Sequence, residues 1–494
     1  MHLCPIRSFL TLPLSVRLHR IASLDPFSED KQANSLTMAK TFTRDEVAKH
    51  NTEDSVWFII DSKVYDVSEF LDAHPGGEAV LRQVAGKDAT SDFYNLHRHE
   101  VLTKYDDDLL IGTVAGEKPT VVTPQPGDLS TVPYAEPLWL TPAFKSPYYK
   151  ESHRRLQKAM RIFNEKYIVP EAQACEASGK YISQELVDKL SKAGILHMRM
   201  GPGKHLHGVN LLDGAVRGEE FDYFHDLVVS QEGVRANARG FQDGQLAGML
   251  IGLPCIMNFM KDEKRKKSII DEVLSGKKYM SLAITEAFAG SDVAGLRTTA
   301  TKTSDGKHYI VNGTKKWITN GVFSDYFITG VRTGKGLSVL LIERGEGVET
   351  KPIKTSYSPA AGTTYITFDN VKVPAENLLG EENKGIYVIL SNFNHERWMM
   401  ACGSIRMSRT VVEECLKWAH QRIVFGKRLI DQPVIRQKYV FHFPPPHSRK
   451  YPTRALTLIP LKQTSKDDRP RRGEPSLARD YHLPNVQHAL QRTG

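Results

Sequence analysis

The sequence has few cysteines and no hydrophobic run long enough to cross a membrane. Its five cysteines are scattered over 494 residues, and no two of them form a CxxC pair. This spacing indicates neither a disulfide framework nor a zinc site and is typical of a reducing compartment. The most apolar stretch, AGMLIGLPCIMNFM at 247–260, is interrupted by glycine, proline and asparagine. We therefore expect a protein that does not span the membrane.

Two further features are missing. The chain contains no GxGxxG, so a Rossmann type of dinucleotide site is not indicated. It also lacks an excess of Lys and Arg spread along the whole sequence, although its formal net charge is +9. Residues 449–494 hold ten Lys and Arg against four Asp and Glu, and they supply +6 of that charge. The rest of the chain is nearly balanced, so we expect no nucleic-acid partner.

The length of the chain predicts two to four domains. The first 39 residues are expected to be a disordered leader. Its first 24 residues carry Arg7, Arg17 and Arg20 and no acid, as an organelle presequence does, whereas MAKTFTRDEV from Met38 looks like an independent start. Both interpretations stay open. We expect a mitochondrial or peroxisomal location, with the cytoplasm as the alternative.

Residues 40–117 predict a small α+β domain that binds haem. SVWFIIDSKVYDV forms a hairpin pattern around Asp61-Ser62, and HPGG begins at His74, 23 residues before His97. A haem with two histidine ligands needs one imidazole on each face of a flat apolar slot. These features resemble the cytochrome b5 family, which implies a haem b with His74 and His97 as axial ligands. His99 is the alternative to His97.

The remainder of the chain changes its pattern several times. We expect successive segments with distinct properties, namely a proline-rich linker at 118–145, a helical domain at 146–276, a β-domain at 277–384, a helical segment at 385–438 and an atypical, disordered tail at 439–494. Within the β-domain, the turn at Asp305-Gly306 predicts a hairpin.

Two stretches of the β-domain have the composition of ligand-binding loops. AITEAFAGSDVAG (283–295) offers the hydroxyls of Thr285 and Ser291 and glycines that let the backbone approach a flat ligand. KKWITNG (315–321) adds the planar side chain of Trp317 and the donor of Thr319.

Together these stretches resemble the acyl-CoA dehydrogenase family over about residues 146–438. The resemblance implies a multidomain fold, with a helical domain, a central β-domain and a C-terminal helical bundle that is incomplete here because the similarity stops after Lys438. It also implies FAD bound between the β-domain and the bundle. The cofactor-binding residues that it implies are Leu282, Ala283, Ile284, Thr285, Ser291, Trp317, Ile318, Thr319 and Arg422, the last reaching the FAD of a neighbouring subunit.

The family's reaction is α,β-dehydrogenation of an acyl-CoA, which requires a carboxylate base in a dry pocket. Some family members place this base in a Glu-Arg pair on the first bundle helix, and Glu396-Arg397 in SNFNHERWMM matches that position. The resemblance implies that Ser291, Asn394 and Arg397 line the CoA arm. Helical spacing predicts one buried stripe on this helix, with Glu396 at its edge: Ile386, Ile389, Leu390, Phe393, Arg397, Met400 and Ala401.

The sequence therefore predicts a flavoenzyme fused to a haem domain, with the haem relaying electrons. We expect an acyl-CoA substrate and either an electron-transfer flavoprotein or another electron acceptor. The family forms tetramers, an assembly that an incomplete bundle would weaken. Two alternatives remain open: a haem-binding electron carrier with an inactive flavin domain, and an acyl-CoA oxidase that uses oxygen.

Overall fold

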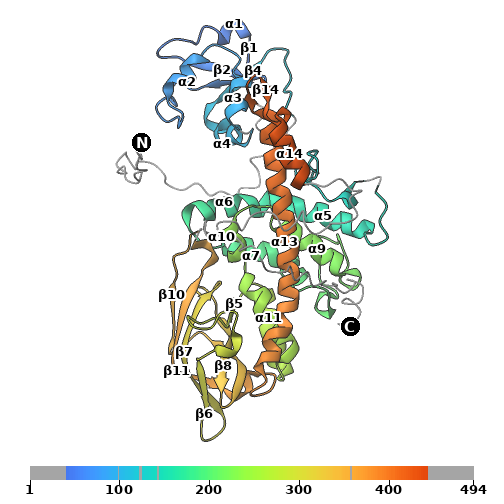
Figure 1. Ribbon diagram of the computed structural model, residues 1–494, viewed down its shortest axis with the longest axis vertical. Helices are drawn as coiled ribbons and strands as arrows, with labels where there is room; N and C mark the ends of the chain where they lie inside the picture. The colour runs from blue at the N-terminus through green and yellow to red at the C-terminus, as the bar shows by residue number, and fades with distance from the viewer. Residues whose placement is uncertain (1–39, 98, 122–124, 142–143, 357–358, 443–494) are drawn as a thin grey trace, which may run out of the picture. The chain divides into compact units, whose positions relative to one another are not determined.

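The computed structural model describes residues 40–97, 99–121, 125–141, 144–356 and 359–442. Within these ranges the chain divides into two compact units: the first comprises residues 40–121 and 421–423, and the second comprises the other described residues (Figure 1). The expected leader at 1–39 and nearly all of the expected tail at 439–494 lie outside the described residues. The helix α14 (Pro433–His442) extends four residues past the predicted start of that tail.

The first unit is a four-stranded sheet with helices packed against it. Its strands follow the order β1-β4-β3-β2, and β1 pairs with β4 in parallel. Its elements are β1 (Thr41–Phe42), α1 (Arg44–Val47), β2 (Trp57–Ile60), β3 (Lys63–Asp66), α2 (Glu78–Gln83), α3 (Thr90–Leu96), α4 (His99–Leu109) and β4 (Leu110–Val114). The predicted hairpin is confirmed, since β2 pairs antiparallel with β3 across Asp61 and Ser62, both at positive φ.

The second unit begins with a helical domain. Its helices are α5 (Glu151–Phe163), the π-helix η2 (Asn164–Ile168), α6 (Val169–Ser178), α7 (Gln184–Lys192), α8 (Ile195–Met198), α9 (Tyr223–Gly233), α10 (Arg239–Gly244), α11 (Ala247–Phe259) and α12 (Glu263–Leu274). Side-chain caps explain where several of these helices start: Ser183, Asp222 and Asp262 each accept backbone N–H groups of the first turn. In the described residues, no helix is long and apolar enough to span a membrane.

A β-domain follows. Its main sheet has the order β10-β11-β7-β6-β8-β9-β12, and β5 joins it beside β8. The strands are β5 (Met280–Ala283), β6 (Thr299–Lys302), β7 (His308–Ile318), β8 (Tyr326–Thr333), β9 (Gly336–Glu343), β10 (Val348–Pro352), β11 (Thr364–Pro374) and β12 (Leu378–Leu379). Strands β6 and β7 pair antiparallel across the Asp305-Gly306 turn, which confirms the second predicted hairpin.

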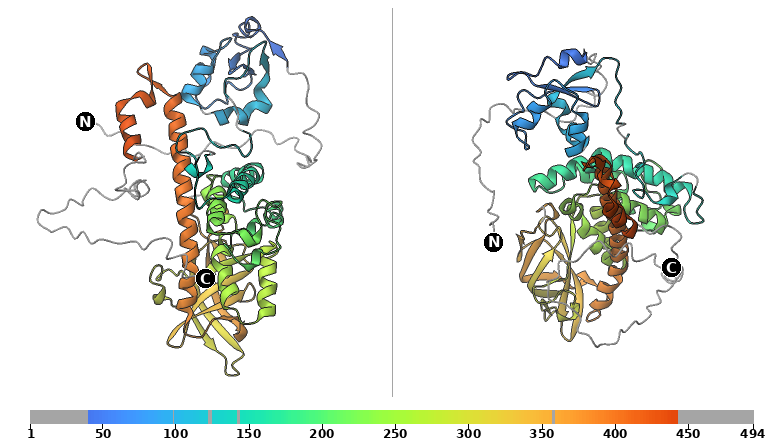
Figure 2. Two further views of the ribbon diagram at one scale, coloured as in Figure 1. Left: turned by 90° about the vertical axis from the view of Figure 1, so that its right-hand side faces the viewer. Right: turned by 45° about the horizontal axis from the view of Figure 1, so that its top comes forward.

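The long helix α13 (Gly385–Gln421) runs along both domains of the second unit, beside the β-domain at its start and the helical domain further on (Figure 2). A short pair, β13 (Ile423–Val424) and β14 (Lys427–Arg428), follows it. The expected combination of a cytochrome b5-like fold, a helical domain, a β-domain and the start of a helical bundle is thus the fold observed.

The predicted buried stripe of α13 is wrong in its second half. Leu390 is 48% exposed, Met400 is 60% exposed, and Arg397 and Ala401 are exposed as well. The buried face instead carries polar residues that find partners, among them Asn392, His395 and Arg406. Helical periodicity of apolar residues does not detect such a face, because its hydrogen bonds replace hydrophobic contacts.

The segment 118–145 is not a free linker along its whole length. Trp139 and Leu140 are buried in the core of the helical domain. Glu136 forms ion pairs with Arg161 of α5 at 2.7 Å and with Arg406 of α13 at 2.8 Å. These contacts attach the later part of the segment to the second unit.

Candidate functional site

In the first unit, His74 and His97 face each other. Their ring centroids are 6.0 Å apart at an interplanar angle of 47°. His74 comes from the loop before α2, while His97 ends α3. Gly76 allows the tight turn beside His74, since a Cβ at this position would lie 2.7 Å from the imidazole Cε1.

The pair has the spacing that a haem iron requires. Imidazole nitrogens bind metals at about 2 Å, so two rings on opposite faces of one iron have centroids about 6 Å apart. The Nδ1 of His74 lies 3.1 Å from the Gly77 carbonyl oxygen, a contact that orients the ring and leaves Nε2 as ligand. Phe93 stacks on His97 at 4.8 Å and Phe70 lies edge-on to His74 at 6.0 Å. The residues present therefore fit a haem.

The alternative ligand His99 is engaged elsewhere. Its Nδ1 lies 3.0 Å from the hydroxyl of Tyr94, and the two rings are stacked. In contrast, Nδ1 of His97 is buried and has no hydrogen-bond partner among the described residues. The geometry favours His97 over His99 as the second ligand.

In the second unit, the two predicted flavin stretches lie side by side. Lys316 N donates to Thr285 O at 2.9 Å, and the Ser281 hydroxyl donates to Thr319 O at 3.0 Å. Where the two stretches meet, Leu282, Ala283 and Ile284 are buried, whereas Thr285 and Thr319 are half-buried. The backbone and hydroxyls of both stretches are thus available to one flat ligand.

Trp317 has the properties of a ligand-contacting residue. Its side chain is 51% exposed although it belongs to β7, next to the buried Ile318. Its backbone is left-handed, with φ at 64°, a region that is unfavourable for a bulky residue. Ser291 is also exposed, in the loop after β5. An exposed aromatic ring in a strained conformation beside free hydroxyls fits a flavin.

A buried ion pair links the two predicted flavin stretches, and the sequence analysis did not identify it. Lys315 is 0% exposed, and its Nζ contacts Glu286 Oε1 at 2.8 Å and Ile284 O at 3.0 Å. Glu286 also accepts the backbone N–H groups of Arg297 and Thr298. The signal in the sequence was the alternation of β7, which points Lys315 inward with Val311. The pair joins the loop of residues 283–295, the signature loop, to β7.

Glu396 is half-buried on α13, and its pKa is raised. Burial raises the pKa of the carboxyl above its ordinary value near 4.5, while the charge of Arg397 lowers it in part. Arg397 is exposed and its guanidinium carbon lies 5.6 Å from the centre of the Phe393 ring. Asn394 is exposed too. The carboxyl is therefore drier than a surface glutamate, with two polar side chains accessible beside it.

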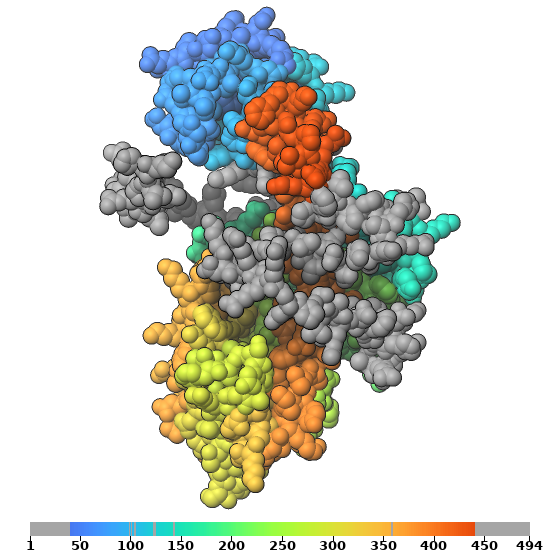
Figure 3. Space-filling view, viewed as in Figure 1, coloured from blue at the N-terminus to red at the C-terminus, as the bar shows by residue number. Residues whose placement is uncertain are grey.

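The start of α13 packs next to the signature loop. The side chains of Ile284, Leu296 and Ile389 converge over Gly330, where a Cβ would lie 3.1, 3.0 and 3.6 Å from them. In the space-filling view, orange atoms of α13 lie beside the yellow-green atoms of the segment after β5 (Figure 3). Glu396 follows Ile389 by seven residues, about 10 Å along the helix axis.

Arg422 is not brought to this site. It follows directly after α13 and is 26 residues from Glu396, roughly 40 Å along a continuous helix. Within one chain it cannot contact a flavin at the signature loop. Its predicted role, contact with the FAD of a neighbouring subunit, stays a prediction.

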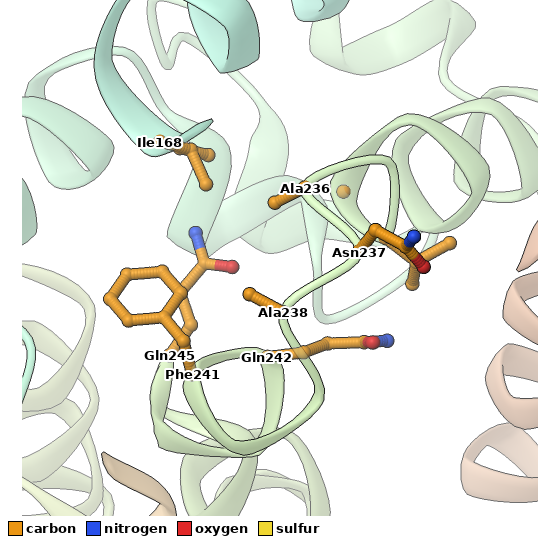
Figure 4. Close-up of a pocket in the computed structure, with 9 residues that line it drawn as sticks. Ile168, Ala236, Asn237, Ala238, Phe241, Gln242 and Gln245 are labelled. Atoms are coloured by element: carbon orange, nitrogen blue, oxygen red, sulfur yellow. The ribbon is translucent and has the colours of Figure 1, made fainter. Parts of the chain in front are cut away.

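A small pocket lies in the helical domain, between Ile168 and the segment 233–245. The Gln245 carboxamide projects towards Ile168 beside Phe241, whereas Asn237 and Gln242 point away (Figure 4). None of the predicted site residues lines this pocket.

One cluster in the described residues has the composition of a metal site: His153, Asp222 and His225. Its atoms are already used, however. His153 Nδ1 accepts the backbone N–H of Lys150, so its Nε2 carries the proton that is donated to Asp222 at 3.0 Å. Asp222 also caps α9. The cluster joins α5 to α9 and needs no ion.

The fold and these two sites define an oxidoreductase with a haem-binding domain and a flavin-type domain. Family models match residues 43–115 as a cytochrome b5-like heme/steroid binding domain, and residues 281–371 and 383–440 as the middle and C-terminal domains of acyl-CoA dehydrogenase. The chain belongs to the acyl-CoA dehydrogenase family, whose members act on CH–CH groups, and it also carries a cytochrome b5-like domain. The family implies FAD, and the b5-like domain implies haem binding.

Relatives support this assignment. The chain is 42% identical over 321 residues to the acyl-CoA dehydrogenase apdG of Emericella nidulans, covering 63% of this chain and 73% of that protein. It is 31% identical over 301 residues to the mitochondrial long-chain specific acyl-CoA dehydrogenase of Sus scrofa, covering 59% and 65%. The structure of butyryl-CoA dehydrogenase from Megasphaera elsdenii is similar at a TM-score of 0.53 and 26% identity, covering 60% and 76%.

Proposed function

We propose that the protein catalyses FAD-dependent α,β-dehydrogenation of an acyl-CoA thioester, with Glu396 as the base. The observation that supports this most is the position of Glu396. Its half-buried carboxyl, whose pKa is raised, lies on α13, which packs near Ile284 of the signature loop and continues along the helical domain.

Glu396 would remove the α-proton of the acyl group. A carboxylate with a raised pKa is a stronger base than a solvated one, and burial supplies this effect here. Thr285, Ser291 and Trp317 would hold the flavin, which when bound accepts the β-hydrogen as hydride. Arg397, an exposed cation one residue further on, suits the phosphates of the CoA arm.

Replacing Glu396 tests the assignment. We expect Glu396→Gln to bind FAD normally and to lose flavin bleaching by acyl-CoA, measured in a panel of butyryl-, isovaleryl-, octanoyl- and palmitoyl-CoA. The control is Glu414→Gln, which removes an equal charge about five turns further along α13 and should keep the activity. Full activity of Glu396→Gln with FAD bound would remove the assignment.

The pH dependence has a definite sign. The base acts as a carboxylate, so kcat/KM should fall as pH drops through the pKa of Glu396. Because burial raises that pKa, the fall should be centred above pH 4.5, the ordinary value.

We further propose that a haem b held by His74 and His97 serves as an electron relay for the flavin. Covalent fusion supports this, since it raises the effective concentration of the two centres. Rapid mixing with acyl-CoA should show flavin bleaching followed by haem reduction. Bleaching without any haem reduction would refute the relay.

Another acceptor is an electron-transfer flavoprotein. A relative from Acetobacterium woodii, 28% identical over 292 residues, is named as a subunit of a caffeyl-CoA reductase–Etf complex. Dye reduction that depends on added electron-transfer flavoprotein would favour this acceptor, whereas hydrogen peroxide formed in air would identify an oxidase. Purified protein that contains haem and no FAD would favour the alternative function, a haem-binding electron carrier with an inactive flavin domain.

A further inference from the structure

Asp226 of α9 is a fully buried carboxylate that contacts the helix carrying Glu396. Its Oδ2 accepts hydrogen bonds from His395 Nε2 at 2.9 Å and from Trp398 Nε1 at 3.1 Å. Its Oδ1 is buried as well and has no hydrogen-bond partner among the described residues. Both donors belong to α13, and Glu396 lies between them in the sequence.

This contact is an unfavourable way to pack two helices. Burying a carboxylate removes its hydration, and a bare oxygen leaves part of that loss uncompensated. An apolar pair would join α9 to α13 without desolvating a charge. The need for a cap does not explain Asp226 either, because Asp222 caps α9. What the carboxylate provides is two directed contacts to α13.

Two directed contacts fix how a helix is rotated. His395 and Trp398 are three residues apart, so they occupy neighbouring turns on the same face of α13. Anchoring both to one oxygen restrains the rotation of α13 about its axis and its shift along it. Glu396 is one residue from the first anchor, so its direction follows from that restraint.

The imidazole of His395 is also held from a second side. A Cβ at Gly201 would lie 3.0 Å from its Nε2, so the loop after α8 closes directly against the ring. Gly201 has a φ of 79°, which favours glycine. Trp398 in turn lies edge-on to Tyr223 of α9, with ring centroids 6.5 Å apart. The side chains of His395 and Trp398 therefore have little freedom to move if the orientation of α13 changes.

We propose that Asp226 is a positioning residue for the reaction: through His395 and Trp398 it sets the orientation of α13 at Glu396 and thereby aims the base. This inference rests on the proposed role of Glu396. Proton transfer depends steeply on geometry, and a displacement of about 1 Å can reduce a rate by about 100-fold.

The test uses the full-length holoenzyme and the acyl-CoA of the panel that bleaches the flavin fastest, with and without deuterium at its α-carbon. We expect Asp226→Ala to lower kcat by about 10- to 100-fold with little change in KM or FAD content. Because proton removal becomes slower, the α-deuterium isotope effect on kcat should rise. Asp226→Asn keeps an acceptor oxygen and should show a smaller change in the same direction.

The control variant Asp222→Asn distinguishes loss of the orientation of Glu396 from general loss of stability. Asp222 lies one turn before Asp226 on the same helix, but its side chain contacts His153 of α5 and the start of α9. Asp222→Asn should lower thermal stability without raising the isotope effect. Loss of folded molecules reduces kcat in proportion to FAD content and leaves the isotope effect as it was.

A second readout does not depend on activity. Amide hydrogen exchange of the resting enzyme should be faster over residues 393–400 in Asp226→Ala than in the wild type or in Asp222→Asn. Unchanged exchange and an unchanged isotope effect in both Asp226 variants would overturn the positioning role. If instead Glu396→Gln keeps full activity, the assignment of the base fails, a result that is distinct from failure of Asp226 alone.

Discussion

Removing the charge of Glu286 should destabilise the flavin-binding edge strongly. In the wild type Lys315 is 0% exposed and Glu286 is 3% exposed, and their side chains meet at 2.8 Å. Glu286→Gln leaves a buried ammonium group with neutral acceptors such as Ile284 O and without a compensating charge. Breaking one half of a buried pair in this way costs about 3–5 kcal/mol of stability.

Adding Lys315→Met to Glu286→Gln should restore part of the lost stability. In Glu286→Gln with Lys315→Met, no buried charge is left, and the glutamine oxygen can still accept the backbone N–H of Thr298, which now donates to Glu286 at 3.0 Å. We expect the double variant to be more stable than Glu286→Gln alone, by about 1–3 kcal/mol in a double-mutant cycle.

The pH response of stability has the same sign for both members of the pair, because the pKa of each group is lowered in the folded protein. Burial would raise the pKa of Glu286, but the hydrogen bond and charge of Lys315 lower it below its ordinary value. Burial lowers the pKa of Lys315 to about 8, and Glu286 only partly opposes this. Between about pH 8 and 10.5 the unfolded chain therefore binds more protons at Lys315, so stability rises with pH there. In Glu286→Gln this rise should begin at lower pH.

The assay must separate the two units, because a single unfolding transition is not expected. Release of FAD on heating, followed by flavin fluorescence, reports on the second unit, and loss of the haem absorbance reports on the first. Glu286→Gln should shift flavin release and leave haem release unchanged. A loss below about 1 kcal/mol, or a double variant less stable than Glu286→Gln, would refute the argument from the buried pair.

Three further predictions concern other parts of the chain. His97→Ala should abolish the spectrum of a haem with two histidine ligands, whereas His99→Ala should keep it; haem titration followed by absorbance distinguishes them. Trp317→Gly should lower FAD affinity while leaving the stability of the flavin-free protein within about 1 kcal/mol, because relief of the strained φ offsets lost contacts; calorimetry with FAD measures both. Glu136→Gln should destabilise the second unit by about 3 kcal/mol at pH 7, because it leaves Arg161 partly unpaired. Burial raises the pKa of Glu136 but its arginine partners lower it overall, so the difference between variant and wild type should shrink as pH falls below 4.5 in acid unfolding curves.

Local motifs carried most of what the sequence could predict. HPGG with a later histidine predicted a haem site because turn geometry and ligand chemistry are short-range, and the structure brings His74 and His97 to 6.0 Å between ring centroids. The stretches 283–295 and 315–321 were predicted for the same reason, and the structure places them side by side.

Long-range polar contacts could not be predicted in this way. The face of α13 that packs on the helical domain is held by Asn392, His395 and Arg406, whose partners lie far away in the sequence. Apolar periodicity therefore failed for the second half of the predicted stripe. The same limit applies to Glu136, which attaches a proline-rich segment to two helices through arginines. A carboxylate in a loop carries no local sign of such partners.

The measurement that tests the central claim most directly is an anaerobic absorbance spectrum of the purified full-length protein before and after addition of acyl-CoA. The account predicts haem and flavin bands in the resting protein, flavin bleaching on addition of substrate, subsequent haem reduction, and no bleaching in Glu396→Gln. Flavin bands that no acyl-CoA of the panel bleaches, or bleaching that persists unchanged in Glu396→Gln, would contradict it.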